Sequence, residues 1–162
     1  MLTQHYRWDP SWQSFFTKML QHSIKIDAQE NGSWAELDAI SSRVIASVIP
    51  ALLGPLESDG RTVKPSLIHG DLWDGNIGTD YETGDVYIFD AGAYYAHNEM
   101  ELGMWRCERH RFVNNKIYLR EYLRNAGVSE PVEQFDDRNR LYCVYMNMWA
   151  SAHHAGGIDR TT

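Results

Sequence analysis

The sequence predicts a mainly α-helical protein with one small β-hairpin. Apolar residues recur at helical spacing over most of the chain, and strand-like residues are confined to two short runs between residues 77 and 89. The chain has 162 residues, of which 43% are hydrophobic, and this is enough for one domain with a substantial core. We therefore expect residues 1–162 to form a single domain.

Two helices are expected before residue 66. Asp9 and Pro10 favour a helix start, and the stripe that follows predicts a first helix over about residues 10–20. Ser33 and Glu36 have the spacing of a capping box at the start of a second helix, which Pro50 and Gly54-Pro55 should end. The two apolar stripes are Trp12, Phe15, Phe16, Met19 and Leu20, and then Leu37, Ile40, Val44 and Val48.

A hairpin and three helices are expected after residue 76. Ile77 to Thr79 and Val86 to Phe89 are predicted strands, separated by a turn rich in Asp, Glu, Thr and Gly. Asn98 and Glu101 are a capping signal for a helix that includes Leu102, Trp105 and Phe112. The last two helices are predicted over residues 116–126, with Gly127 as a stop, and over about 137–153, before Gly156-Gly157.

Composition argues against several functions. The net charge of -7 and the lack of a dense Lys/Arg run disfavour a nucleic-acid partner. Cys107 and Cys143 are far apart in sequence, so neither a disulfide framework nor a zinc cluster is indicated, and a reducing, cytoplasmic location is expected. No signal peptide is recognised and no uninterrupted apolar segment approaches the length of a membrane span, so we expect a soluble protein without a membrane partner.

The segment SLIHGDLWDGN, residues 66–76, carries the most specific chemical signal. Asp71 and Asn76 have the spacing of H-x-D-x-x-x-x-N, a catalytic-loop pattern of phosphoryl transferases. In that pattern the aspartate takes the proton of the acceptor hydroxyl and the amide oxygen ligates a metal ion. Asp90, within the segment 86–92, follows the predicted hairpin, whose reversal would bring it beside Asn76. Two hard oxygen ligands facing one ion suit Mg²⁺.

The order of elements is that of the C-terminal helical lobe of a protein kinase-like fold. A glycine-rich phosphate loop and a strand lysine would normally precede such a lobe. Before residue 66, Gly32 stands alone, and Lys18 and Lys25 lie in or beside the first helical stretch. We therefore expect the N-terminal nucleotide lobe to be absent from this chain and to come from the same gene or in trans.

The segments HGDLWDGN and FDAGAYYAHNEMELGMW, with the W-x-x-FF pattern of residues 12–16, resemble the fructosamine kinase family. This family, also called ketosamine or protein-ribulosamine 3-kinases, is part of the aminoglycoside phosphotransferase-like kinases. The resemblance implies ATP- and Mg²⁺-dependent phosphorylation of a sugar 3-hydroxyl in fructosamine or ribulosamine adducts, which destabilises the adduct and frees the amine. It also implies that Asp71 is the catalytic base, that Asn76 and Asp90 hold Mg²⁺, and that Trp73 lies at the substrate side.

Two departures from the family pattern affect this site. Asp90-Ala91-Gly92 stands where the family usually has Asp-Pro-Ala, which leaves the metal ligand intact and loosens the turn after it. Asp74 stands where the family often has Ser, and its added charge near the phosphates would hinder them or recruit a cation. These departures leave the identity of the sugar-amine open.

Other residues near the motif have competing interpretations. His69 is expected to brace the loop by hydrogen bonding and not to do chemistry. Trp73 could stack on a sugar face or pack in the loop. The acceptor pocket could include Tyr95, His97 and Glu99, with loop packing as the alternative, especially for Tyr94 and Tyr95. Glu101 is interpreted as a helix cap, and Trp105, Met146, Met148 and Trp149 as core residues. His153 and His154 are interpreted as a solvated or pocket-lining helix end.

Three functions therefore remain open. The first is the catalytic and acceptor lobe of a deglycation kinase, which we expect to be inactive without a nucleotide lobe. The second is a non-catalytic module that binds a sugar-amine. The third is a metal-dependent phosphoesterase that uses His69, Asp71 and Asp90.

Overall fold

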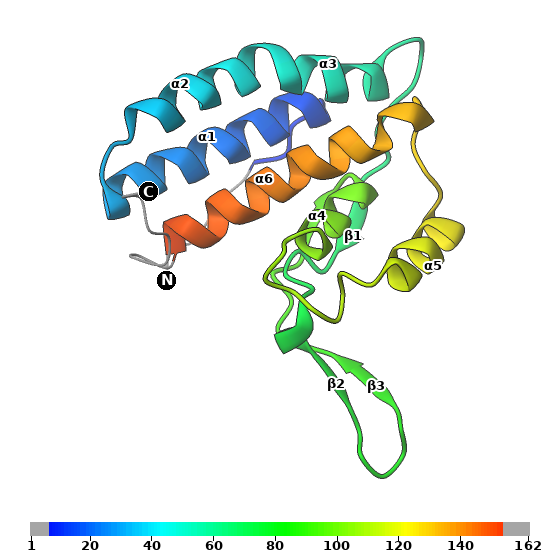
Figure 1. The fold of residues 1–162 in the computed structure, drawn as a ribbon. Coiled ribbons are helices and arrows are strands. Elements are labelled where there is room, and N and C mark those ends of the chain that lie inside the picture. The colour runs from blue at the N-terminus through cyan, green and yellow to red at the C-terminus, as the bar shows by residue number, and fades with distance from the viewer. Residues whose placement is uncertain (1–6, 154–162) are drawn as a thin grey trace.

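The structure is a computed structural model that describes residues 7–153. Figure 1 shows α1 and α6 side by side, α2 and α3 along the other side of α1, and the β2–β3 hairpin projecting from the helical body. The helices are α1 (Trp12–Asn31), α2 (Ala35–Arg43), α3 (Ile49–Leu53), α4 (Glu101–Trp105), α5 (Lys116–Ala126) and α6 (Phe135–His153). The strands are β1 (Ser66–Ile68), β2 (Ile77–Thr79), β3 (Val86–Ile88) and β4 (Tyr94–Ala96). The prediction of a mainly helical protein is confirmed.

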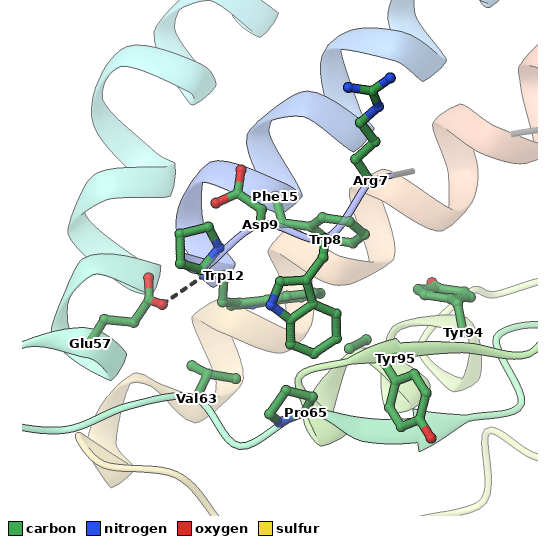
Figure 2. Close-up of a pocket in the computed structure, with 12 residues that line it drawn as sticks. Arg7, Trp8, Asp9, Trp12, Phe15, Glu57, Val63, Pro65, Tyr94 and Tyr95 are labelled. Carbon is green, nitrogen blue, oxygen red and sulfur yellow. Dashed lines mark hydrogen bonds between the residues drawn. The ribbon is translucent and has the colours of Figure 1, made fainter. Parts of the chain in front are cut away.

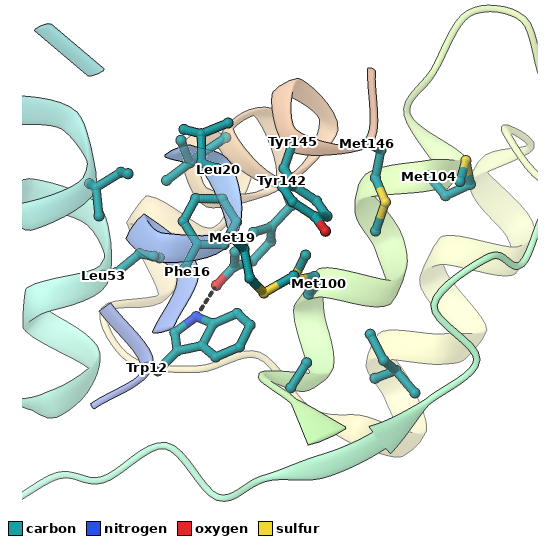
Figure 3. Close-up of a cluster of buried hydrophobic side chains, with 14 of the residues drawn as sticks. Trp12, Phe16, Met19, Leu20, Leu53, Met100, Met104, Tyr142, Tyr145 and Met146 are labelled. Atoms are coloured by element: carbon teal, nitrogen blue, oxygen red, sulfur yellow. Dashed lines mark hydrogen bonds between the residues drawn. The ribbon is translucent and has the colours of Figure 1, made fainter. Parts of the chain in front are cut away.

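The core lies between α1, α4 and α6 (Figure 3). Phe16 and Tyr142 are fully buried, with their rings edge to face and their centroids 5.4 Å apart. The indole Nε1 of Trp12 donates to the hydroxyl of Tyr142 at 3.0 Å, so the polar atoms of both residues are paired inside the core. The apolar stripe that predicted the first helix therefore does face the core, because side chains three and four residues apart share one face of a helix.

Helix α1 begins later and ends later than the sequence predicted. Its N-cap is Ser11, and Asp9 accepts hydrogen bonds from the backbone of Ser11 and the hydroxyl of Ser14. The carboxylate of Glu57 accepts from the backbone N–H groups of Trp12 and Gln13, at 2.7 and 3.1 Å. A distant carboxylate therefore caps the positive end of this helix, and no local pattern could reveal it.

The second predicted helix is present, but its predicted cap is wrong. Its N-cap is Trp34 without a side-chain hydrogen bond, so Ser33 and Glu36 form no capping box. A π-helical turn (Val44–Val48) joins α2 to α3, which contains Pro50 in its first turn and ends at Leu53, directly before Gly54-Pro55. Pro50 therefore does not end the helix, whereas the predicted end at Gly54-Pro55 is confirmed. Ile40 and Val48 are exposed, but Val44 is partly buried and packs against the core, so the predicted stripe faces the core only in part.

The helical stretch Ala35–Glu57 also corrects an expectation about membranes. At 23 residues it is long and apolar enough to cross a membrane, and 22% of its most apolar window is buried. One such helix is weak evidence, because core helices and signal sequences pass the same test of length and composition. The statement that no segment approaches the length of a membrane span was nevertheless wrong.

Two antiparallel strand pairs position the loop of residues 69–76. The predicted hairpin is confirmed: β2 pairs with β3, with Ile77 opposite Ile88 and Thr79 opposite Val86. The sequence did not predict the second pair, in which β1 joins β4, with Ile68 opposite Tyr94. This pair holds both ends of the segment that contains the predicted catalytic loop and Asp90.

The helices of the second half agree with the sequence to different degrees. Helix α5 and its Gly127 stop are confirmed, and α6 begins two residues before the predicted start at Asp137. Helix α4 ends at Trp105, so Phe112 lies in the loop that follows it, and Asn98 begins a short 3₁₀ turn without a side-chain cap. His154 and Gly156-Gly157 lie outside the described residues.

Candidate active site

The loop of residues 69–76 carries the predicted catalytic and metal-binding side chains. It leaves β1, makes a 3₁₀ turn at Asp74–Asn76 and enters β2 directly. Gly70 lies at φ +77°, where a Cβ would come within 2.6 Å of the Tyr94 ring. Glycine is therefore required at this position for both its backbone conformation and the close approach of Tyr94, which is in contact with the loop.

Asp71, Asn76 and Asp90 come together as the sequence predicted. The Asn76 side-chain nitrogen donates to the Asp71 carboxylate at 2.9 Å and to the Asp71 carbonyl at 2.8 Å. The same nitrogen is 3.5 Å from the carbonyl oxygen of Asp90. With its nitrogen engaged in this way, the amide has only its oxygen to offer a cation.

Asp90 and Asp71 differ in their surroundings. Asp90 is exposed and has φ +60°, a left-handed conformation that is uncommon outside glycine. Burial raises the pKa of Asp71, the hydrogen bond from Asn76 opposes this effect, and the charge of Asp90 adds to it. The two carboxylates line the same cavity, so their charges can interact.

His69 contacts the backbone through both ring nitrogens. Its Nε2 lies 3.0 Å from the carbonyl oxygen of Phe89, and its Nδ1 accepts from the N–H of Asp71 at 3.3 Å. Because Nδ1 accepts, Nε2 carries the proton and donates to Phe89. The ring thus links the catalytic loop to the residue before Asp90, which is the geometry that a bracing role requires.

Glu101 holds the start of the loop, a role that sequence reasoning missed. Its buried carboxylate accepts from the N–H groups of His69 and Gly70, at 2.6 and 3.2 Å. Burial raises the pKa of Glu101, and these two hydrogen bonds act against the rise. The interpretation of Glu101 as a helix cap is therefore wrong. Nothing in the local spacing signals a contact across 32 residues.

Asp74 and Trp105 fix the rest of the loop. The Asp74 carboxylate accepts from the backbone N–H groups of Arg111, Phe112 and Val113, at 2.8, 3.2 and 3.0 Å. Burial alone would raise its pKa, but these three hydrogen bonds outweigh burial and lower it. Asp74 therefore ties the catalytic loop to residues 111–113, a role that the sequence did not indicate. The indole of Trp105 donates to the Leu72 carbonyl at 3.0 Å, so Trp105 is more than a core residue.

Trp73 lies beside the catalytic residues and is 39% exposed. Its ring is packed over Gly75, where a Cβ would come within 2.4 Å of the indole, and lies 5.7 Å from the imidazole of His110. The indole therefore packs against the protein on one side and is still accessible to a ligand. Both interpretations offered from the sequence, packing and stacking on a sugar, are compatible with this position.

A cavity of about 790 Å³ contains the predicted catalytic residues. Asp71, Asn76, Asp90 and Trp73 line it together with Arg109 and His110, from the loop after α4. The remaining wall comes from Met104 on α4 and from six residues of α6: Met146, Asn147, Trp149, Ala150, Ser151 and His153. Met146 and Trp149, interpreted as core residues, therefore also face the cavity. His153 lines the pocket, as one of its two interpretations stated.

Three residues proposed for the acceptor pocket lie elsewhere. His97 is buried between Tyr142 and Ser129, with both ring nitrogens 2.8 Å from their hydroxyls. Glu99 is fully buried in an ion pair with Arg138. Tyr95 lines a different pocket, of about 380 Å³, beside Trp8 and Trp12 (Figure 2). The structure therefore does not bring these three residues into the cavity of Asp71 and Asp90, because closeness in sequence to Asp90 does not place them there.

The oxygen atoms at this site fit a hard divalent cation. Asp90 is exposed to a ligand, and Asn76 has its oxygen as the remaining donor, so a carboxylate and an amide oxygen are available together. Among residues 7–153, no group of three or more His, Cys, Asp or Glu side chains could hold a metal. An ion at this site would therefore need oxygen atoms from a substrate as well, which is the usual situation of Mg²⁺ in phosphoryl transfer.

Comparisons with known proteins indicate the family that the chain resembles. A family model described as "Fructosamine kinase" matches residues 1–159. Over 158 residues the chain is 36% identical to "Protein-ribulosamine 3-kinase, chloroplastic" of Oryza sativa subsp. indica, with 94% of this chain and 42% of the relative covered. It is 32% identical over 148 residues to "Ketosamine-3-kinase" of Mus musculus, with 88% and 42% covered. The chain thus spans about two fifths of the length of these curated relatives.

Proposed function

The chain belongs to the fructosamine kinase family, and from this membership we propose that it supplies the catalytic and acceptor-binding part of a deglycation kinase. The complete enzyme would use ATP and Mg²⁺ to phosphorylate a sugar hydroxyl of a fructosamine- or ribulosamine-type adduct. Its relatives are named as kinases of ribulosamines and ketosamines, which supports a sugar-amine as the acceptor. A cytoplasmic location is part of this proposal.

The fold would act as the C-terminal lobe of a protein kinase-like enzyme. The helical body, the loop of residues 69–76 and the β2–β3 hairpin occur in the order that this lobe requires. The nucleotide-binding lobe would come from the same gene or from another chain. By itself, the 162-residue chain should show weak or undetectable phosphoryl transfer.

One observation carries the proposal. Asp71, Asn76 and Asp90 line the same cavity, and a single amide nitrogen connects Asn76 to Asp71 at 2.9 Å. The amide hydrogen bond fixes the Asp71 carboxylate, which leaves its other oxygen for the acceptor hydroxyl. The spacing of Asp71 and Asn76 predicts these roles, in which Asp71 contacts the acceptor hydroxyl and Asn76 ligates the metal ion.

Asp71 would orient the acceptor hydroxyl and accept its proton. Burial raises the Asp71 pKa, which makes the carboxylate a somewhat better base, but a carboxylate cannot deprotonate an alcohol in advance. Proton transfer would therefore come late, as the hydroxyl oxygen bonds to phosphorus and becomes acidic. The main contribution of Asp71 is to hold the nucleophile in line.

Asn76 and Asp90 would hold the divalent cation. Bound Mg²⁺ would neutralise charge on the transferring phosphoryl group and on the leaving nucleotide. The chain's own part is to keep the two oxygen donors in place through the Asp71 hydrogen bond and the His69–Phe89 contact. Glu101 accepts a hydrogen bond from the backbone of His69, and Trp105 donates one to the backbone of Leu72. These two contacts on either side of Asp71 limit its movement.

The two alternative functions make different demands on the site. A phosphoesterase that used His69 as a metal ligand would need a free ring nitrogen, but both nitrogens contact the backbone. A non-catalytic binding module would keep the cavity and bind a sugar-amine without transferring phosphate. Phosphoryl transfer therefore distinguishes the module from the kinase.

The proposal is tested in a chimera that joins the N-terminal part of the rice relative to residues 1–162 of this chain. We expect ATP- and Mg²⁺-dependent phosphorylation of a fructosyl-amine, measured by ³¹P NMR. Asp71→Asn and Asp90→Asn should each lower kcat by about a thousandfold or more, since each removes a group that acts on the transition state. A folded chimera that binds ATP without transferring phosphate, or an Asp90→Asn variant with unchanged kcat, would refute the proposal.

A further inference from the structure

His110 has a buried nitrogen with no partner at the wall of the catalytic cavity. The residue is 5% exposed, and its Nε2 makes no hydrogen bond within the part of the chain that the structure describes. Its ring packs against Trp73 at 5.7 Å and lines the same cavity as Asp71. A buried polar atom without a partner is costly, so this nitrogen is suited to meeting a ligand.

Arg109 brings a positive charge to the same wall. One guanidinium nitrogen donates to the side-chain oxygen of Asn147, and the other terminal nitrogen lies 3.8 Å from the sulfur of Met104. Asn147 and Met104 both line the cavity, so the guanidinium lies along its wall. Asn147 is neutral, and no acidic side chain in the described residues forms an ion pair with Arg109.

The two residues are fixed relative to the catalytic loop. Asp74 binds the backbone of residues 111–113 immediately after them, and Trp73 packs on His110 from the same loop. Burial, together with the charge of Arg109, lowers the pKa of His110, while Asp74 and Asp71 act in the opposite direction. At neutral pH the imidazole is therefore uncharged and Arg109 supplies the charge.

The cavity thus combines carboxylates with an available cation. Asp71 suits the acceptor hydroxyl, Asp90 is assigned to the divalent cation, and Arg109 suits an anion on the acceptor. In such an acceptor the substituent on nitrogen is the variable part, and a guanidinium recognises a carboxylate with two parallel hydrogen bonds. The sugar adduct of an amino acid carries the sugar hydroxyl for Asp71 and a carboxylate for Arg109 in one small molecule.

We propose that Arg109 and His110 select an acceptor that carries a carboxylate, namely the sugar adduct of a free amino acid. Arg109 binds the carboxylate, and the Nε2 of His110 donates a hydrogen bond to it. The inference rests on the proposed function, because it identifies the class of acceptor that this cavity takes. It adds two specificity-determining residues that the sequence motif does not include.

The test measures binding to the full 162-residue chain by isothermal titration calorimetry. The two probes are fructosyl-glycine, which has the carboxylate, and 1-amino-1-deoxyfructose, which lacks it. We expect fructosyl-glycine to bind about tenfold or more tightly than 1-amino-1-deoxyfructose, as a charged hydrogen-bonded pair requires. Arg109→Gln should remove this difference by weakening fructosyl-glycine, and it should not weaken 1-amino-1-deoxyfructose, which has no carboxylate.

Two further variants separate recognition from folding. Arg111→Gln is the matched control, because Arg111 is exposed two residues away and does not line the cavity. It should bind both probes as the parent chain does. His110→Phe keeps a ring against Trp73 and removes the unpaired nitrogen, so it should weaken fructosyl-glycine alone and leave the free energy of unfolding undiminished.

Several results would overturn the inference. Equal affinity of the parent chain for the two probes would refute carboxylate selection while leaving sugar-amine binding, and with it the proposed function, intact. An equal loss for both probes in Arg109→Gln would show a general effect on the cavity. Failure of both probes to bind would count against the inference and against the acceptor-binding part of the proposed function.

Discussion

Two short segments of this chain share the pattern of a histidine followed two residues later by an acid, yet they have opposite environments. Asp71 lines a cavity that a ligand can enter and contacts a neutral amide, and His69 contacts the backbone of the same loop. His97 and Glu99 are buried, and each polar atom of these side chains meets a hydroxyl, an N–H or a guanidinium. Residue type and spacing therefore do not determine whether such a pair lies at a candidate active site or stabilises the fold.

The difference comes from what surrounds each pair. Arg138 donates through Nε and Nη2 to the two oxygens of Glu99, at 2.8 and 3.0 Å, and also donates to the carbonyls of Ser129 and Pro131. This network fixes the loop before α6 on the core. Asp71 instead lines an open cavity, and His69, Glu101 and Trp105 bind the backbone of its loop and not its carboxylate. One segment uses its charges to stabilise the fold, and the other keeps them available.

The largest effect is expected when the buried ion pair is broken. Glu99→Gln should lower the free energy of unfolding by about 3–5 kcal/mol, because it leaves the Arg138 charge buried without its counterion. Urea unfolding followed by circular dichroism measures this loss. The matched control is Asp136→Asn, which affects exposed pairs with Arg106 and Arg140 and should cost about 1 kcal/mol or less. Equal effects of the two variants would contradict the structural role of Glu99.

A smaller effect is expected from the buried histidine. Burial lowers the pKa of His97 from 6.5 to about 4, so between these pH values the unfolded chain binds a proton that the folded chain does not. Stability from this group is complete above pH 6.5 and falls by roughly 3 kcal/mol as the pH drops to 4.

The variant His97→Gln should flatten this part of the pH profile of the unfolding free energy. Its absolute stability is expected to fall as well, since contacts with Tyr142 and Ser129 change, but the slope against pH is independent of that offset. An unchanged slope in His97→Gln would show that another group causes the acid sensitivity.

The sequence predicted those parts of the fold that depend on local patterns. Helix α5, its Gly127 stop and the β2–β3 hairpin follow from periodicity and turn residues, and the structure contains all three. The π-helical turn before Pro50 and the pairing of β1 with β4 depend on tertiary contacts. No window of sequence contains that information, because the paired strands are separated by the whole catalytic segment.

The same distinction applies to the candidate site. The spacing of Asp71, Asn76 and Asp90 was sufficient to predict that they meet. Glu101 and Asp74 were missed because their carboxylates bind backbone groups more than 30 residues away, and a backbone N–H leaves no trace in the sequence. Cys107 and Cys143 likewise lie far apart in sequence, although their sulfur atoms are 3.6 Å apart. Long-range contacts with the backbone or within the core are therefore the contacts that the sequence alone did not predict.

Asn76 and Asp90 are proposed to provide oxygen ligands for a divalent cation beside Asp71. Mn²⁺ is a paramagnetic probe for the Mg²⁺ site, and its binding to the chimera in the presence of ATP, which supplies the remaining oxygen ligands, can be measured by water proton relaxation. Asp59 gives a matched control, because it is the other non-glycine residue with positive φ in the described chain and lies outside the cavity. Asp90→Asn should abolish most Mn²⁺ binding, whereas Asp59→Asn should preserve it. Equal Mn²⁺ affinity in the parent chimera and in Asp90→Asn would show that Asp90 is not a metal ligand.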